Sequence, residues 1–167
     1  MFLKIDISNL NEVVGRLLRL SQGLQDRTEL HQAIGLKMRE NTDRRFNQGA
    51  APDGTRWKES LRAKEKGGQT LRDTGLLQNS IDFATDRNGL TFGAFVGGSN
   101  IHYARIHQEG GVIKPKKAKY LAFTLANGEF RRVKQVVIPA RPYIGVSPDD
   151  EEDIVDLAVR FMERLVQ

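Results

Sequence analysis

The sequence contains no cysteine, and no run of apolar residues approaches the length of a membrane-spanning helix. The absence of cysteine excludes disulfide bonds and all metal sites that use thiolate ligands. The first residues lack a charged segment followed by an apolar block, so we expect no secretory signal. With 39% apolar residues in 167, the chain is expected to form a single soluble domain over residues 1–167, made in a reducing cytoplasm without a membrane.

Histidine is also scarce, and two of the three histidines fall within residues 101–111, which read IHYARIHQEGG. Apolar and aromatic residues, Tyr103 among them, are followed by polar residues and then by Gly110 and Gly111, a pattern typical of a structural corner. The alternative is a metal or catalytic site formed by His102, His107 and Glu109. We favour the corner because no cysteine, no third histidine within helical reach and no second carboxylate cluster accompanies these residues. We therefore expect no catalytic residue, metal or cofactor.

The net charge of +5 is unevenly distributed along the chain. Residues 76–147 contain ten basic and four acidic residues, whereas residues 148–167 contain two basic and seven acidic residues. A basic middle and an acidic end are therefore available for contacts with different partners.

The N-terminal part predicts one strand and two helices. Leu3, Ile5 and Ile7 alternate with polar residues, as in a half-buried strand. Apolar residues then recur at helical spacing up to about Gly23, and again from about Asp26 to a stop at Gly49. We expect these helices to cover a sheet. The alternative is that part of their apolar stripe meets a neighbouring subunit.

Residues 47–72 lack periodicity and are predicted to form a mobile loop. A turn at residues 52–57 holds the only tryptophan, Trp57, which we expect to pack on the core; the alternative is a binding anchor. Lys64 and Lys66 lie on a solvated arm within residues 58–70 and are candidate partner contacts. The sequence does not show whether this arm orders only on docking.

The next region predicts two β-hairpins, with turns at residues 86–89 and 126–128. Basic residues gather on the second hairpin and its approach. The candidate contacts among them are Lys116, Lys117, Arg131, Arg132 and Lys134. They could face phosphate, or they could protect a sheet edge from unwanted strand pairing.

The end of the chain predicts an extended strap and a final helix. Pro139 and Pro142 prevent regular ladder pairing and leave Arg141 free to pair, which completes the structural corner. Ser147 is the expected N-cap of the helix, with Pro148 at its first position. The acidic residues that follow exceed what capping requires and could meet the basic surface of a neighbouring copy. The candidate contacts among them are Asp149, Asp150, Glu151 and Glu152.

In this order the motifs resemble the phage virion morphogenesis family, the tail completion proteins of long-tailed bacteriophages. The resemblance runs from about residue 30 to the end and includes residues 138–145 of the strap and the closing helix. In the corner the matching residues are Tyr103, Ala104, Ile106, His107, Gln108, Gly110 and Gly111, whereas Glu109 stands where the family often has an aromatic residue. The other matching residues are Phe46, Pro52, Gly54, Trp57, Leu71, Gly75, Leu77, Ser80 and Ile81.

The resemblance implies an α+β fold. With the elements predicted above, this is a twisted antiparallel sheet of two hairpins plus an N-terminal strand, packed by two N-terminal helices and one C-terminal helix. It also implies a non-enzymatic, tail-terminator-like neck protein that completes the tail and enables head–tail joining in the virion. Its partners would be further copies in a ring, by analogy a hexamer, together with tail tube, possibly sheath, and a head–neck connector, with DNA passing through. The alternatives are a head-side connector or closure protein and a nucleic-acid-binding protein.

Overall fold

The computed structural model describes residues 10–95, 100–125 and 127–167 of the chain. The predicted N-terminal strand at residues 3–7 lies outside the described residues. None of the helices in the described ranges is both long enough and apolar enough to cross a membrane.

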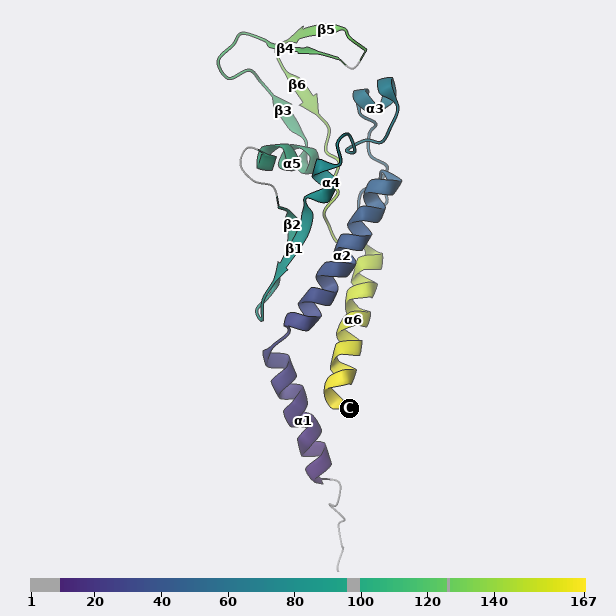
Figure 1. Ribbon diagram of the computed structural model, residues 1–167, viewed down its shortest axis with the longest axis vertical. Helices are drawn as coiled ribbons and strands as arrows, with labels where there is room; N and C mark the ends of the chain where they lie inside the picture. The colour runs from purple at the N-terminus through teal and green to yellow at the C-terminus, as the bar shows by residue number, and fades with distance from the viewer. Residues whose placement is uncertain (1–9, 96–99, 126) are drawn as a thin grey trace, which may run out of the picture.

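Three long helices form the lower part of the molecule in Figure 1. They are α1 (Leu10–Gln25), α2 (Thr28–Gln48) and α6 (Pro148–Val166), which confirms the three helices predicted from periodicity. α2 and α6 lie side by side and run in opposite directions, while α1 extends beyond them (Figure 1). Gly49 ends α2 as predicted: its N–H makes a last helical hydrogen bond to the Arg45 carbonyl at 2.8 Å, and its left-handed φ of 66° turns the following chain out of the helix.

The strands form three antiparallel pairs within the described residues. β1 (Ile81–Thr85) pairs with β2 (Leu90–Ala94), and β4 (Leu121–Thr124) pairs with β5 (Phe130–Val133), as the two predicted hairpins require. β3 (Gly111–Ile113) pairs with β6 (Val136–Ile138), directly before the strap. The fold class is therefore α+β, as predicted.

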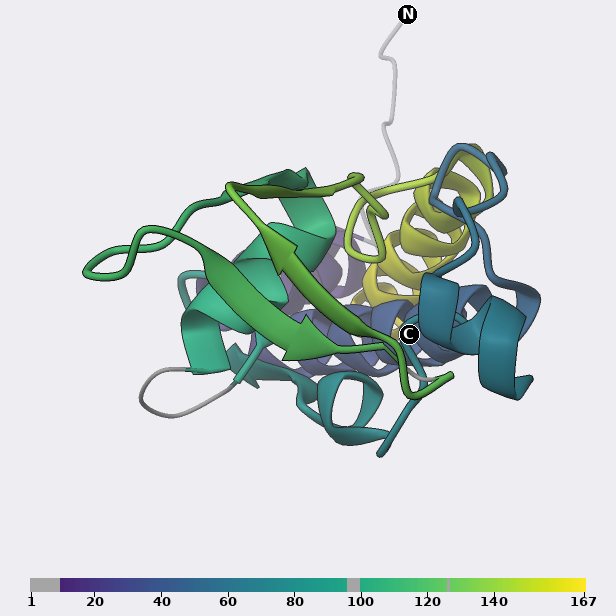
Figure 2. The ribbon, with the colours of Figure 1, turned by 90° about the horizontal axis from the view of Figure 1, so that it is seen from above.

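The strand pairs do not join into the single sheet that we expected. β3–β6 and β4–β5 are two parts of one long ribbon, but seven residues separate β3 from β4 while two separate β5 from β6. This unequal spacing, with Pro115 on the longer side, interrupts the ladder. Seen from above, the ribbon crosses the end of the molecule (Figure 2).

Three short helices complete the structure: α3 (Leu61–Lys66), α4 (Leu76–Asn79) and α5 (Asn100–Glu109). α3 lies in the region expected to be a loop, and the Ser60 hydroxyl caps it by accepting a hydrogen bond from the Ala63 N–H at 3.2 Å. α5 occupies most of the predicted corner, and the chain turns from it into β3 at Gly110 and Gly111.

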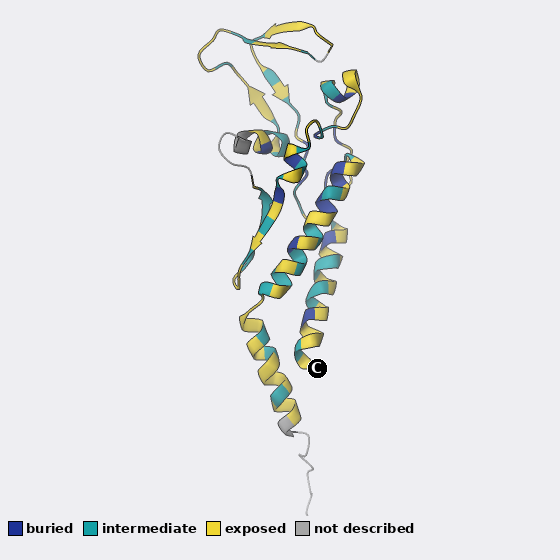
Figure 3. Ribbon diagram, viewed as in Figure 1, coloured by how far each residue is buried: buried dark blue, intermediate teal, exposed yellow. Residues whose placement is uncertain are grey.

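The core lies where the C-terminal end of α2 meets the loop, β1, α5 and the strap. Phe46 is its centre, with the rings of Trp57 and Tyr143 each 5.5 Å away. Phe161 is buried on α6, and the apolar residues Ile154, Leu157, Ala158 and Leu165 of the same helix are half-buried. α1 contributes little to this core and is mostly exposed (Figure 3).

Candidate functional site

The predicted corner is a joint between α5 and the strap, organised by Gln108. The Gln108 side-chain carbonyl accepts hydrogen bonds from the N–H groups of Tyr143 and Ile144, both at 3.0 Å. Its amide donates to the Ile144 carbonyl at 2.7 Å. The Tyr143 hydroxyl donates to the Ala104 carbonyl at 2.9 Å. Neither proline of the strap offers an N–H, so these side-chain bonds replace the strand ladder that ends at Ile138.

Four of the predicted corner residues meet at this joint. The Arg141 N–H donates to the His107 carbonyl at 2.8 Å. Gly110 has φ of +73°, and a Cβ there would lie 2.7 Å from the backbone nitrogen of Ala140. Pro142 accepts from the Trp57 indole N–H at 2.8 Å, so the tryptophan packs on the core as expected. The predicted corner contacts did not include Gln108, although a side-chain amide offers both donors and acceptors to an extended strap.

Arg141 ties the same joint to the loop. Its side chain is buried and donates from Nε to the Lys58 carbonyl at 2.6 Å. Burial lowers the pKa of this guanidinium. The strap therefore holds both α5 and the segment after Trp57 in place.

The ring of His107 packs edge-on against Tyr103, with 4.6 Å between ring centroids. Burial, and then the charge of Arg141, lowers the pKa of His107, so the neutral imidazole is favoured. Glu109 points elsewhere and pairs with Arg105 at 2.8 Å. The side chain of His102 is outside the described part of the chain. Among the residues that the structure describes, no group of three His, Asp or Glu residues could hold a metal ion.

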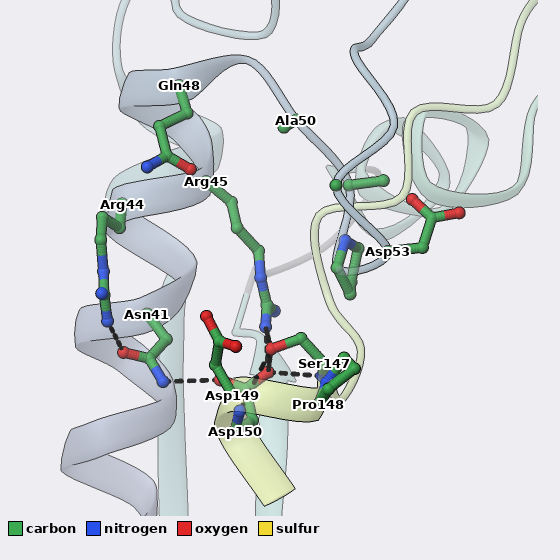
Figure 4. A pocket seen from close by; sticks show the side chains of 13 residues that line it. Asn41, Arg44, Arg45, Gln48, Ala50, Asp53, Ser147, Pro148, Asp149 and Asp150 are labelled. Atoms are coloured by element: carbon green, nitrogen blue, oxygen red, sulfur yellow. Dashed lines mark hydrogen bonds and ion pairs between the residues drawn. The ribbon is translucent and has the colours of Figure 1, made fainter. Parts of the chain in front are cut away.

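A second joint connects α2 to the start of α6. Ser147 is the N-cap with Pro148 after it, as predicted, and Asp150 completes a capping box with Ser147. The Asp150 carboxylate accepts from the Ser147 N–H and from the Asn41 amide, each at 2.6 Å, and pairs with Arg45. Figure 4 shows these side chains converging on one carboxylate.

The same joint lines a surface pocket of about 310 Å³. Arg44, Asp53 and Asp149 lie around it, so its charges are mixed in sign and do not define a ligand (Figure 4). Asp150 lies beneath, only 1% exposed, and is not available to a partner. Of the four acidic candidate contacts, Asp149, Glu151 and Glu152 are on the surface.

Burial raises the pKa of Asp150, but the hydrogen bonds from Ser147 and Asn41 and the charge of Arg45 outweigh it, and the net shift is downward. The carboxylate is therefore ionised at neutral pH. This group stabilises the joint between two helices, which is a structural role.

The basic candidate contacts are brought together on the projecting ribbon (Figure 1). Arg132 lies 4.5 Å from the centroid of the Tyr120 ring, and Arg131 pairs with Glu129 at 3.0 Å. Phe130 is 65% exposed on the same hairpin. All five basic candidates on the ribbon and its approach are exposed: Lys116, Lys117, Arg131, Arg132 and Lys134.

The loop candidates lie on α3, a separate element from this ribbon. Lys64 and Lys66 are exposed on α3. Arg62 donates to the Gln69 carbonyl at 2.6 Å, and Arg72 to the Asn47 side chain at 2.8 Å, so hydrogen bonds close the base of the segment. Whether the segment moves or orders on docking stays a prediction.

The geometry thus defines a small α+β protein with two hydrogen-bonded joints, an acidic start of α6 and a basic ribbon. Residues 5–163 match the model of the phage virion morphogenesis family, and the chain belongs to that family. It is 29% identical over 165 residues to the Mu-like prophage FluMu G protein 2 of Haemophilus influenzae, a match that covers 99% of each chain. No solved structure matches significantly. Family membership places this protein in phage virion assembly.

Proposed function

We propose that the protein is a structural subunit that completes the phage tail at its head-proximal end and makes the tail competent to join the head. It acts as a homo-oligomeric ring, by family analogy a hexamer, in the neck of the virion. Membership of the virion morphogenesis family and similarity to a Mu-like prophage protein support an assembly role.

The observation that supports the ring is the separation of charge on the surface. The acidic start of α6 and the basic ribbon lie apart in one subunit (Figure 1). A ring closes through heterologous contacts, in which one face of each subunit meets a different face of the next. The exposed acids of α6 and the cations of the ribbon are the proposed pair of faces.

The remaining partners follow from the position of the ring. Tail tube, and sheath where the tail contracts, would meet one side, and a head–neck connector the other. DNA would pass through the opening. Assembly would take place in the cytoplasm of the bacterial host.

Charge reversal tests the proposed contact. Asp149, Glu151 and Glu152 are changed together to lysine, while Asp150 is kept because its buried pair stabilises the fold. We expect a folded subunit that no longer forms rings by native mass spectrometry. The matched control changes Glu59, Glu65 and Glu109 to lysine, which shifts the net charge equally at other exposed sites without breaking an ion pair between elements. Unchanged assembly of the α6 variant would refute this contact.

A complementary variant sharpens the test. Arg131, Arg132 and Lys134 are changed to glutamate, and this protein is expected to stay monomeric alone. Mixed with the α6 variant it should assemble again, because each reversed face then meets its opposite. Electron microscopy with purified tail tubes should show rings at one tube end. A wild-type chain that stays solitary at every concentration and beside tubes would end the ring proposal.

The exposed cations on the ribbon also favour a second candidate, direct binding to nucleic acid. Affinity for duplex DNA would then fall steeply with salt concentration. A ring subunit should show little such affinity alone. A head-side connector is the closest structural alternative, and rings bound to purified heads instead of tails would support it.

A further inference from the structure

Two helices of this chain present apolar residues to solvent at the same spacing. On α6 we define the α6 stripe at positions i, i+4, i+7 and i+11, each between 36% and 60% exposed: Val155, Val159, Met162 and Val166. On α1 the identical spacing defines the α1 stripe: Val13, Leu17, Leu20 and Leu24. At a rise of 1.5 Å per residue, both stripes run for about 16 Å.

The α1 stripe is open to solvent although α1 touches α6 in the same chain. Leu17 is 60% exposed and only Leu20 is half-buried. Val14 and Leu18, beside the stripe, are also exposed. An amphipathic helix ordinarily buries such a face. Figure 3 shows α1 largely exposed along its length.

The internal contact between the helices lies near their C-terminal ends, where the side chain of Leu165 lies directly against Gly23. α6 also packs along α2, where Asp150 pairs with Arg45. In the part of the chain that the structure describes, seven of the eight stripe residues remain exposed and only Leu20 is half-buried.

Charge indicates what covers the two stripes. Apart from the buried Asp150, α6 carries six acidic and two basic side chains, with most of the acids near its start, whereas α1 carries one acidic and two basic. Two copies of α6 would repel each other, while the more basic α1 complements the acidic helix. Complementary charge thus favours α1 against α6 over α6 against itself, and the equal spacing lets the two stripes match along their length.

We propose that the α1 stripe of one copy docks on the α6 stripe of a second copy. This inference rests on the self-association in the proposed function and names one surface of it. The two stripes lie on different helices, so every copy offers one of each. The contact can therefore continue from copy to copy as a heterologous contact in a ring, or it can be made twice in a reciprocal dimer. It buries apolar surface that the isolated subunit leaves in water.

The absence of cysteine allows a direct test by disulfide trapping. A chain carrying Leu17→Cys is mixed in turn with chains carrying Val155→Cys, Val159→Cys or Met162→Cys, which samples different registers. A disulfide requires Cα atoms roughly 4.4–6.8 Å apart, so only facing positions should link efficiently. We expect a covalent heterodimer in at least one mixture, at several times the yield of either chain alone. The control pair, Arg19→Cys with Arg160→Cys, places the thiols away from the stripes and should link poorly.

Native mass spectrometry of Leu17→Asp and Val159→Asp chains provides the second measurement. Both residues are exposed, so circular dichroism should show an unchanged fold while assembly is lost. Rings that form without any stripe cross-link, or despite these substitutions, would overturn the inference and leave the proposed ring intact. Cross-linked pairs that close only as dimers would support the inference and overturn the ring. If Leu17→Asp impairs binding to tail tubes but not self-association, the stripe belongs to another partner and the inference fails.

Discussion

Arg45 of α2 forms an ion pair with Asp150 of α6 in the interior of the protein, with both side chains less than 10% exposed. Asn41 and Ser147 donate to the same carboxylate, so its charge is fully compensated. Because an ion buried without its partner is costly, the pair fixes how α6 sits on α2. It also fixes the direction in which the exposed part of α6 faces possible neighbours.

Replacing Asp150 by asparagine should therefore destabilise the protein by about 3 kcal/mol, since it leaves the Arg45 charge buried without a counterion. The matched change of exposed Asp149 to asparagine should alter the free energy of unfolding by less than about 0.5 kcal/mol. Urea unfolding followed by circular dichroism would compare the two. An equal loss of unfolding free energy in the two variants would show that the buried ion pair contributes no more to stability than an exposed carboxylate.

The lowered pKa of Asp150 also predicts a dependence on acid. Its stabilisation is fully present above the ordinary value of 3.8 and is lost as the pH falls through the lower pKa of the folded state. Between pH 7 and pH 2, the wild type should thus lose more stability than Asp150→Asn. Parallel loss in both proteins would contradict the assigned ionisation.

Burial raises the pKa of Tyr143 to about 12, with a smaller contribution from Tyr103. The unfolded tyrosine ionises near pH 10, so the wild type should lose stability as the pH rises from 10 to 12. Phenylalanine cannot ionise, so the stability of Tyr143→Phe should lack this loss at alkaline pH. At neutral pH the variant should lose about 1 kcal/mol of unfolding free energy, because the hydrogen bond to Ala104 is missing. Thermal unfolding across the alkaline range would show the difference in slope.

Removing the Gln108 side chain should loosen the strap. Gln108→Ala eliminates three hydrogen bonds to Tyr143 and Ile144 and should lower the free energy of unfolding by about 2 kcal/mol. The neighbouring Glu109→Gln alters only an exposed pair and should change little. Hydrogen exchange at the N–H groups of Tyr143 and Ile144 should accelerate in the first variant alone.

Two glycines in helices should respond to alanine in opposite directions. A Cβ at Gly35 would overlap the Phe83 ring where α2 packs on β1, so Gly35→Ala should cost about 1 to 3 kcal/mol. At Gly15 the nearest atom to a new Cβ would be the Arg19 guanidinium at 3.7 Å, so alanine fits. Its higher helix propensity should raise the free energy of unfolding by at most about 1 kcal/mol. Differential scanning calorimetry would show whether the melting temperature falls in Gly35→Ala and rises in Gly15→Ala.

Local sequence signals were sufficient to predict much of the secondary structure of this protein. The three long helices, the Gly49 stop, the cap at Ser147 and both hairpin turns follow from spacing and from residues with one dominant conformational role. The family could also be inferred from the order of the motifs. Each of the structural inferences depends on residues that are close together in the chain, whereas the family inference uses the order of motifs along most of it.

The remaining features of the structure depend on contacts between residues that are far apart in the chain. The sequence by itself determined that an acidic cluster begins α6 and that a polar trio precedes Gly110. Only the tertiary structure placed Asp150 beneath Arg45, aimed Gln108 at the strap and paired β3 with β6. Burial and pairing between distant segments depend on how the whole chain packs, and local periodicity does not contain that information.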